Sequence, residues 1–457
     1  MIVRRISSEG LAACSYFVGS GGDAVVVDPR RDIEAYVALA RERCMSIRHV
    51  LETHRHEDFV LGSARLKAAT GAEIGRGENL SVQYADRRLK DGDTLSVGGL
   101  LVKALETPGH TPDSLSYVLS EADRPDVALL VFSGDALFAG SCGRVDLGGE
   151  SRKAEYGEAL FRSLHEKLLP LGDQAILCPA HGAGSVCGKG ISDRDETTIG
   201  YERMTNGWLS LDRATFVRRK VAERPLRPPY FLRMERWNAA GAPPVPGAPA
   251  PVSSDELASA LREKNVCLVD TRMPQAFAGG HIPGSINILL EGMTVFPGWL
   301  LDPEKPICLV TERPQDAATA GVYLARTGFD QVMGYLCGGF ERWQNRGWPI
   351  GHVGALSVDA LKPMLEAGGI SLIDVREPDE WADGVVPGAR QIFLGDLESH
   401  LPDIPRDAPV AVMCSVGHRG SMGASILRRA GFTNVYNVLG GTTAWASRGF
   451  PLTEYRP

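Results

Sequence analysis

The stretch LETHRHEDFVLG, residues 51–62, is typical of a metal-binding loop of the H-x-H-x-D-H kind that lacks its last histidine. His54, His56 and Asp58 are in place, whereas Phe59 stands where a further imidazole would be expected. Three other segments place a polar residue after an apolar run and beside a Gly or Pro turn: ETPGHTPDSLSY with His110, LVFSGDALF with Asp135, and LCPAHGAG with His181. Because loops at strand ends carry the chemistry of layered folds, we expect the four segments to meet at one edge of a sheet sandwich.

The bulk composition fits an ordinary soluble globular protein of several domains. The 457 residues suggest about three domains of ~150 residues, and 44% hydrophobic with 23% charged residues is unexceptional. The net charge of −7 argues against a sequence-independent grip on nucleic acid. No apolar run approaches the ~18 residues that cross a bilayer, and the start has no signal-peptide pattern. Nine cysteines without a C-x-x-C pair indicate neither a disulfide framework nor a zinc ribbon, so we expect a cytoplasmic, thiol-reduced protein.

A stretch rich in proline and glycine, NAAGAPPVPGAPAP at 238–251, divides the chain. Such a composition cannot build a packed element and predicts a semi-rigid linker. In residues 1–237, short apolar runs alternate with segments whose apolar residues recur at helical spacing. This alternation predicts an α/β or sandwich-type layered domain.

After the linker the sequence repeats itself. VCLVDTRMPQAFAGGHIPGSINI (266–288) matches ISLIDVREPDEWADGVVPGARQI (370–392), and a second pair of segments matches farther along each copy. A duplication this long predicts two copies of one domain of about 100 residues, at 252–352 and 353–457. Strands and helices alternate in each copy, which predicts a small doubly wound α/β unit.

The second copy contains PVAVMCSVGHRGSMG, in which an apolar strand leads to Cys414 and a helix is expected to begin just after Arg419. Backbone N–H groups in such a turn point inward and, with the positive end of the helix, form a nest for an anion. The pattern therefore predicts that Cys414 is a thiolate nucleophile, with a packing role as the alternative. The first copy has Thr311 and Asp316 at the matching positions, so we expect it to be an inactive spacer or docking module.

The Cys414 loop resembles the rhodanese active site, and the likeness extends over the DVRE, VPGA and closing GG…W…G-x-P segments. The resemblance implies that Cys414 carries a sulfane sulfur whose charge the loop amides and Arg419 stabilise. The loop from Cys414 to Arg419 is one residue shorter than in rhodanese-like phosphatases, which suits a persulfide. Arg376, in the DVR segment, is expected to be structural.

Residues 1 to about 235 resemble the metallo-β-lactamase fold, an αββα sandwich. In its two-zinc members the last histidine of the motif serves a second metal, and Phe59 removes that ligand. The compact set that remains, His54, His110 and Asp135, has the composition of the facial triad of non-haem Fe(II) oxygenases. The persulfide dioxygenases of this fold use the matching positions for iron, so the resemblance implies one Fe(II) per chain and no organic cofactor.

The other polar residues are expected to support this centre. His56, Asp58 and His181 would orient the ligands and move protons. Arg144, in a CGRVDLGG segment that resembles the GR-x-D segment of persulfide dioxygenases, would bind a carboxylate or phosphate of the carrier thiol, with a surface salt bridge as the alternative. Cys187 is expected near the metal, either as a sulfur-handling residue or as an ordinary loop cysteine.

Taken together, the chain resembles fusion proteins of a persulfide dioxygenase with two rhodanese-like domains. The resemblance implies sulfide detoxification: O₂ oxidises a low-molecular-weight persulfide to sulfite, and Cys414 passes sulfane sulfur to or from sulfite and thiosulfate. Carriers of the glutathione, coenzyme A or bacillithiol type fit equally, and a homo-oligomer remains open. Two alternatives stay open as well: a zinc-dependent thioester hydrolase of the glyoxalase II kind fused to a sulfurtransferase, and a non-catalytic sulfur carrier.

Overall fold

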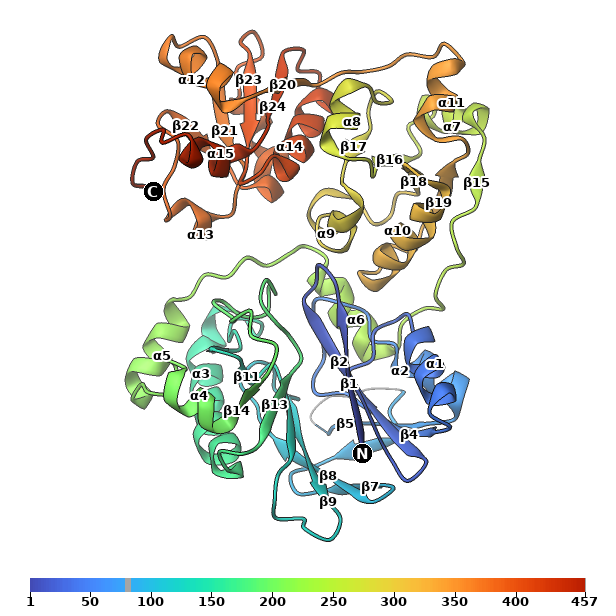
Figure 1. Cartoon of the computed structure of the whole chain (residues 1–457), viewed down its shortest axis with the longest axis vertical. Coiled ribbons are helices and arrows are strands. Elements are labelled where there is room, and N and C mark those ends of the chain that lie inside the picture. Colours follow the sequence, from blue (N-terminus) through green and yellow to red (C-terminus); the bar gives the residue numbers. More distant parts are fainter. Residues whose placement is uncertain (79–83, 457) are drawn as a thin grey trace. The chain divides into compact units, whose positions relative to one another are not determined.

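The computed structural model describes residues 1–78 and 84–456 (Figure 1). The chain forms two compact α/β units, the first comprising Met1–Val245 with Ala325–Gly328, and the second comprising Pro246–Leu324 with Phe329–Pro457.

The first unit contains two six-stranded mixed sheets. The order in one sheet is β1 (Ile2–Ser8), β2 (Ala13–Ser20), β3 (Asp23–Val27), β4 (Ser46–Leu51), β5 (Glu73–Gly77) and β6 (Arg87–Leu89). The order in the other is β14 (Thr197–Thr198), β13 (Ile176–Pro179), β10 (Leu130–Gly134), β9 (Leu115–Glu121), β8 (Leu100–Glu106) and β7 (Thr94–Val97). A two-stranded sheet, β11 (Leu137–Phe138) and β12 (Ser141–Cys142), follows β10.

The apolar runs of the central strands explain why these sheets stack. In β3, Val25 and Val27 belong to the core between the two sheets, whereas Ala24 and Val26 belong to a core shared with the helix residue Tyr36. A strand buried on both faces needs such a continuous apolar run. The sandwich is therefore covered by helices on both sides, which confirms the αββα architecture.

The outer helices of this unit follow the same logic in most cases: Tyr36 and Leu66 pack into the core on one sheet, and Leu160 and Phe216 into the core on the other. These helices are α1 (Glu34–Glu42), α2 (Ser63–Thr70), η1 (Glu150–Arg152), α3 (Lys153–Arg162), η2 (Ser163–Leu168), η3 (Leu169–Leu171), α4 (Ile199–Thr205), α5 (Arg213–Ala222) and α6 (Phe231–Ala240). Helix α6 continues through Ala240, so the first residues of the expected linker at 238–251 are helical.

The second unit contains two five-stranded sheets in which every pair of strands is parallel. The order in one sheet is β15 (Pro251–Val252), β19 (Val332–Leu336), β18 (Ile307–Val310), β16 (Cys267–Asp270) and β17 (Ile286–Asn287). The other has the order β20 (Gly354–Leu356), β24 (Val435–Val438), β23 (Val410–Met413), β21 (Ser371–Asp374) and β22 (Ala389–Gln391). The identical strand order confirms that the sequence repeat is a duplicated domain.

Each copy contributes its own helices. The first has α7 (Ser254–Arg262), α8 (Pro274–Gly279), η4 (Leu290–Thr294), α9 (Pro297–Leu300), α10 (Pro314–Arg326) and α11 (Gly339–Asn345). The second has α12 (Val358–Glu366), α13 (Pro378–Trp381), η5 (Leu394–Asp403), α14 (His418–Arg429) and α15 (Gly441–Ser447). Both copies also keep the same buried ion pair, Arg272 with Asp270 at 2.6 Å and Arg376 with Asp374 at 2.7 Å. Arg376 is therefore structural, as the sequence predicted.

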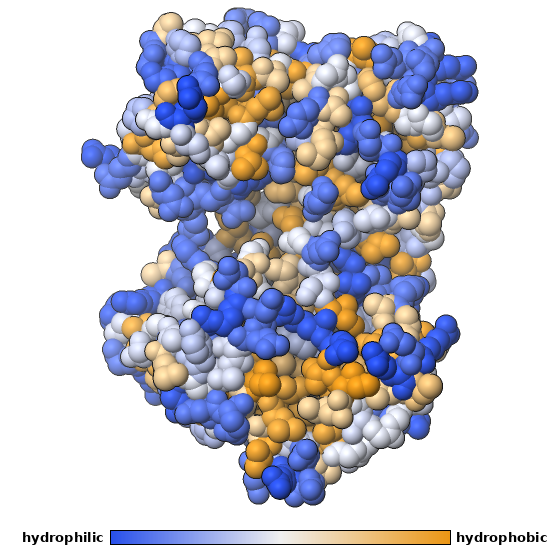
Figure 2. Space-filling model, in the orientation of Figure 1, coloured by the Kyte–Doolittle hydropathy of each residue, from blue (hydrophilic) through white to orange (hydrophobic). Residues whose placement is uncertain are grey.

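The two copies share one continuous apolar core, to which Val269 and Met293 contribute from the first copy and Val410 and Met422 from the second. On the face shown in Figure 2, hydrophilic residues surround smaller hydrophobic patches. Within residues 1–78 and 84–456, none of the helices combines the length and the apolarity that crossing a membrane would require.

Candidate metal centre and thiol loop

Loops after strands β4, β8 and β10 bring three predicted ligands together in the first unit. His54, His110 and Asp135 are each at most 1% exposed. The Nε2 atom of His110 lies 3.4 Å from Oδ2 of Asp135, and the Nε2 atom of His54 lies 3.7 Å from the same oxygen. Gly143 permits this close arrangement, because a Cβ there would lie 2.0 Å from the carbonyl oxygen of Asp135.

Both imidazoles are oriented so that their Nε2 atoms face the Oδ2 atom of Asp135. His110 Nδ1 donates to the carbonyl oxygen of Arg144 at 3.0 Å. His54 Nδ1 lies 2.9 Å from the hydroxyl of Thr53, which donates its own proton to Asp28 and so accepts from His54. The two Nε2 atoms and the nearby carboxylate Oδ2 are buried and have no hydrogen-bond partner among the described residues. Buried polar atoms are normally paired, so the residues present fit a bound divalent ion.

The electrostatics agree with this fit. Burial, together with His56 and His110, lowers the pKa of His54 well below its usual value, so its imidazole is neutral at pH 7 and able to ligate. Burial also acts to lower the pKa of His110, but the carboxylates of Asp135 and Glu57 outweigh it and raise that pKa. Buried carboxylates of this kind attract a cation.

A second group of polar residues holds Asp135 in place. His181 Nδ1 donates to Asp135 Oδ1 at 2.7 Å, and its Nε2 donates to Asp58 Oδ2 at 2.8 Å. Although burial opposes it, the two carboxylates raise the pKa of His181 well above its usual value, so both ring nitrogens carry protons. These hydrogen bonds hold the Asp135 carboxylate in one orientation, and the supporting role expected for this group stays a prediction.

The same group also has donor atoms close enough to hold an ion of its own. Single ligand atoms of His56, Asp58 and His181 lie within 4.8 Å of one another. Phe59, which is 2% exposed, packs 4.5 Å from the His56 ring, between ring centroids, where it supplies apolar surface and no ligand. The group therefore offers three ligand residues, provided that His181 gives up one proton, and it lacks the fourth that Phe59 replaces.

Two residues near the metal loop are absent from the sequence prediction. Glu57 is a fully buried carboxylate whose Oε2 lies 3.8 Å from His110 Nε2. Asn238 is buried on α6, where its amide donates to the carbonyls of His56 and Phe59 and accepts from the N–H of Leu61. Glu57 stands at an unspecified position of the H-x-H-x-D motif, and a carboxylate there could have been recognised as a candidate from the sequence. Nothing in the local pattern around Asn238 indicated its role.

Arg144 has a structural role instead of the carrier-binding role expected for it. Its Nε and Nη2 atoms each bond to the Asp146 carboxylate at 2.6 Å. Its Nη1 donates to the carbonyls of Val186 and Leu226 at 3.0 and 2.9 Å, and the residue is 2% exposed. A guanidinium with four internal bonds has no open face for a substrate anion, so the carrier-binding role expected for Arg144 is wrong, and its ion pair is the salt bridge of the alternative in a buried form. Its carbonyl orients His110 instead.

Cys187 lies next to the metal site, as its position after His181 suggested. Its Sγ is within 4.8 Å of single ligand atoms of His110 and Asp135, and the residue is 1% exposed. Burial, with the charges of Asp58 and Asp135, raises the pKa of the thiol well above its usual value. Without an ion, Cys187 is therefore a neutral thiol at pH 7.

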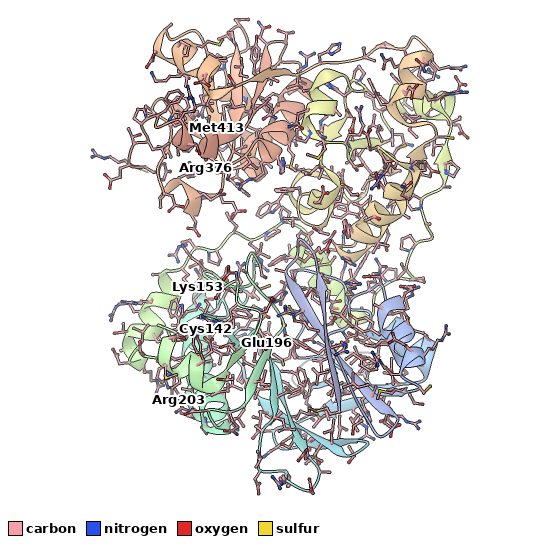
Figure 3. All side chains as sticks on the ribbon, in the orientation of Figure 1. Cys142, Lys153, Glu196, Arg203, Arg376 and Met413 are labelled. Atoms are coloured by element: carbon pink, nitrogen blue, oxygen red, sulfur yellow. The ribbon has the colours of Figure 1, made fainter. Side chains whose placement is uncertain are left out.

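In the second unit, β23 ends at Met413 (Figure 3) and delivers Cys414 to a tight loop. Cys414 is 1% exposed, and the N–H of Gly417 points at its Sγ at 3.1 Å. Helix α14 begins at His418, so Arg419 lies in its first turn and not before it as expected. The loop amide, the helix N-terminus and the thiol meet at one point, which is a suitable place for a negatively charged sulfur.

Arg419 lies beside this loop and is fixed by a carboxylate. Its Nη2 donates to Glu380 Oε1 and to the hydroxyl of Ser415, both at 2.7 Å. Burial opposes ionisation of Glu380, but the bonds from Arg419 dominate and lower its pKa to about 2. Glu380 thus positions the guanidinium near Cys414.

The loop of the first copy that corresponds to the Cys414 loop has different residues at the positions of the cysteine and the arginine. Thr311 takes the position of the cysteine, and Asp316 pairs with Arg313 at 2.8 Å. Thr311, Glu312 and Glu341 line a cavity of about 360 Å³ there. Arg272, which pairs with Asp270, also lines this cavity, and Thr311 offers a hydroxyl where the second copy has a thiol.

Family models match most of the chain. The model "Metallo-beta-lactamase superfamily" matches residues 10–181, and the model "Rhodanese-like domain" matches residues 253–346 and 357–448.

Individual relatives agree with these models. The persulfide dioxygenase ETHE1, mitochondrial, of Bos taurus is 28% identical over 225 residues, which is 48% of this chain and 80% of that protein. The probable metallo-hydrolase YqgX of Bacillus subtilis is 30% identical over 199 residues, covering 39% of this chain and 89% of that one. The crystal structure of a metallo-beta-lactamase from Staphylococcus aureus superposes with a TM-score of 0.64 at 30% identity, covering 74% of this chain and 98% of that one.

Proposed function

The chain belongs to the metallo-β-lactamase superfamily and carries two rhodanese-like domains, and on this basis we propose that it oxidises a low-molecular-weight persulfide with O₂ and transfers sulfane sulfur through Cys414. The likeness to persulfide dioxygenase ETHE1, together with the rhodanese-like domains, supports a role in sulfur metabolism. The observation that carries the finer proposal is the convergence of three buried, unpaired atoms: Nε2 of His54, Nε2 of His110 and Oδ2 of Asp135.

Two imidazoles and one carboxylate suit a single Fe(II) ion, and His54, His110 and Asp135 would hold it. When bound, Fe(II) supplies the redox chemistry that lets O₂ oxidise a sulfur atom. Conversion of a sulfane sulfur to sulfite releases four electrons, and O₂ accepts four. Water completes the balance: RSSH, O₂ and H₂O give RSH, sulfite and two protons. No external reductant or organic cofactor enters this equation.

The protein residues around the site have defined tasks. His54 and His110 keep their Nε2 lone pairs free because their Nδ1 protons are committed to Thr53 and to a backbone carbonyl. His181 holds Asp135 by donating to Oδ1, which leaves Oδ2 free. The proton on the other nitrogen of His181 is shared with Asp58, so this pair can pass a proton when sulfite and thiol form.

At the second unit the proposed step is nucleophilic. The Cys414 thiolate attacks the sulfane sulfur of thiosulfate, a new S–S bond forms, and the old S–S bond breaks with its electron pair leaving on sulfite. In the reverse direction, sulfite takes the sulfane sulfur from the Cys414 persulfide. The N–H of Gly417, directed at Sγ, stabilises the negative sulfur in both directions.

The deciding experiment measures O₂ consumption with glutathione persulfide and with coenzyme A persulfide. The protein is stripped of metal and reloaded with Fe(II) or with Zn(II). We expect persulfide-dependent O₂ uptake with Fe(II) only, with sulfite and thiosulfate as products. If zinc dominates in the purified protein and the zinc form hydrolyses thioesters without O₂ uptake, the proposal is wrong.

One observation favours a second candidate, a zinc-dependent hydrolase. His56, Asp58 and His181 can approach a second ion, and the relative YqgX is named a probable metallo-hydrolase. The replacement of the motif's final histidine by Phe59 counts against a complete two-zinc site. Metal content per chain and the thioester assay separate the two candidates.

A further inference from the structure

Glu57 brings a second carboxylate to the metal site. Its Oε2 lies 3.8 Å from His110 Nε2, and one oxygen of Glu57 forms a set with His54 and His110 in which all ligand atoms lie within 4.8 Å. The residue is 0% exposed, and Oε2 has no hydrogen-bond partner in the described part of the chain.

On its other side, the Glu57 carboxylate has one weak contact to a cation among the described residues. Arg55 Nη2 approaches Oε1 at 3.4 Å, and it also lies 3.5 Å from Glu235. A buried carboxylate normally requires full pairing, because leaving its charge unpaired costs several kcal/mol. A cation bound between the two Nε2 atoms would satisfy Oε2 directly.

The distances are those of atoms that surround one ion. Ligands held about 2.1 Å from a metal are roughly 3.0 Å apart when adjacent in an octahedron and roughly 3.4 Å apart in a tetrahedron. The pair His110–Asp135 is at 3.4 Å, His54–Asp135 at 3.7 Å and His110–Glu57 at 3.8 Å. A cation held by the two Nε2 atoms would therefore lie close to the Asp135 carboxylate on one side and within reach of Glu57 on another.

We propose that Glu57 is a fourth protein ligand, which gives the centre two imidazoles and two carboxylates. This inference rests on the metal centre of the proposed function. Two carboxylates neutralise the charge of a divalent ion and favour harder ions such as Mn(II) and Fe(II) over zinc. They also leave one position fewer for persulfide and O₂ than a three-residue site does.

The test compares Glu57→Gln with wild type in the full chain, without turnover. Metal retention is measured by dialysis against a graded chelator series, and coordination is read from the visible absorption spectrum of the Co(II)-loaded protein. We expect metal affinity to fall about 10- to 100-fold and the Co(II) bands to change, because glutamine keeps the volume and loses the charged oxygen. The metal affinity of Glu57→Asp, which keeps a carboxylate, should lie between those of wild type and Glu57→Gln.

Glu235→Gln is the matched control, since Glu235 shares Arg55 and is not part of the ligand set. It should leave affinity and spectrum unchanged. A Glu57→Gln protein with wild-type affinity, or with lower affinity and an unchanged Co(II) spectrum, overturns the ligand assignment. The circular dichroism spectrum and the melting temperature of each variant, compared with wild type, check that the first unit is folded. Absent O₂ uptake in wild type would contradict the proposed function and leave this assignment untouched.

Discussion

At the scale of single residues, His110 tests the metal centre most directly. His110→Ala removes one of the proposed ligands, so metal content and persulfide-driven O₂ uptake should collapse while sulfur transfer by Cys414 persists. Metal analysis and an O₂ electrode on the same preparation measure both. His165→Ala is the control in the same unit, because His165 stacks on Phe161 and lies outside the ligand set. Full metal occupancy in His110→Ala would show that the ligands are misassigned.

The ion pair between Glu380 and Arg419 beside the thiol loop predicts that the stability of the protein depends on pH. Arg419 lowers the pKa of Glu380 from 4.5 to about 2 in the folded protein, against the effect of burial. Because the folded pKa is depressed, the stability that this pair contributes is complete above pH about 4.5 and is lost as the pH falls toward about 2. The melting temperature of wild type should therefore drop more steeply across this window than that of Glu380→Gln. Parallel melting curves for the two proteins would contradict the assignment.

The residue scale also shows what a sequence can and cannot reveal. His54, His110, Asp135 and Cys414 were readable because each lies in a short motif whose spacing reflects its chemistry. Arg144 was misread, since the carbonyls that enclose it come from segments far along the chain and leave no local pattern.

At the scale of elements, α14 links the thiol loop to the first rhodanese-like copy. Ser421 on α14 donates to Asn287 Oδ1 at 2.6 Å, and the N–H of Asn287 donates to Ser425 at 3.1 Å. Asn287 is the last residue of β17, so the first copy holds the helix whose N-terminus faces Cys414. The duplicated strands were predictable from the repeat. This contact between the copies was not, because Asn287 and Ser421 are far apart in sequence and no local pattern connects them.

Asn287→Ala tests this support. The substitution leaves the buried Ser421 hydroxyl without its acceptor, and such a loss costs about 1–3 kcal/mol. We expect a lower free energy of unfolding in urea and a lower kcat/KM for sulfur transfer, with metal content unchanged. Asn345→Ala, on the exposed end of α11, is the matched control. Unchanged kcat/KM in Asn287→Ala would mean that the inactive copy does not position the loop.

At the scale of the whole molecule, the two proposed chemistries lie in separate compact units of the chain. The metal site is built from residues before Val245 and the thiol loop from residues after Met413. The repeat was readable because two long segments of the sequence match, and a layered domain was readable because apolar runs alternate with helical spacing, whereas the αββα order came from the family resemblance. The predicted start of the linker, residue 238, was less accurate, because α6 extends to Ala240. Asn238 on this helix bonds to the carbonyl of His56 in the loop that follows β4.

This separation predicts that the sulfur-transfer step can be removed alone. Serine is nearly the same size as cysteine, but its hydroxyl is far less nucleophilic at neutral pH and cannot carry a persulfide. Cys414→Ser should therefore abolish sulfur transfer to or from sulfite and leave persulfide-driven O₂ uptake largely intact, so that sulfite accumulates in place of thiosulfate. Early time points and an enzyme-free reaction correct for the spontaneous reaction of sulfite with persulfide. Thr311→Ala, at the matching position of the inactive copy, should change neither activity. If Cys414→Ser formed thiosulfate at the wild-type rate, the rhodanese step would not use Cys414, and Cys187, the buried thiol beside the metal site, would be the next residue to replace.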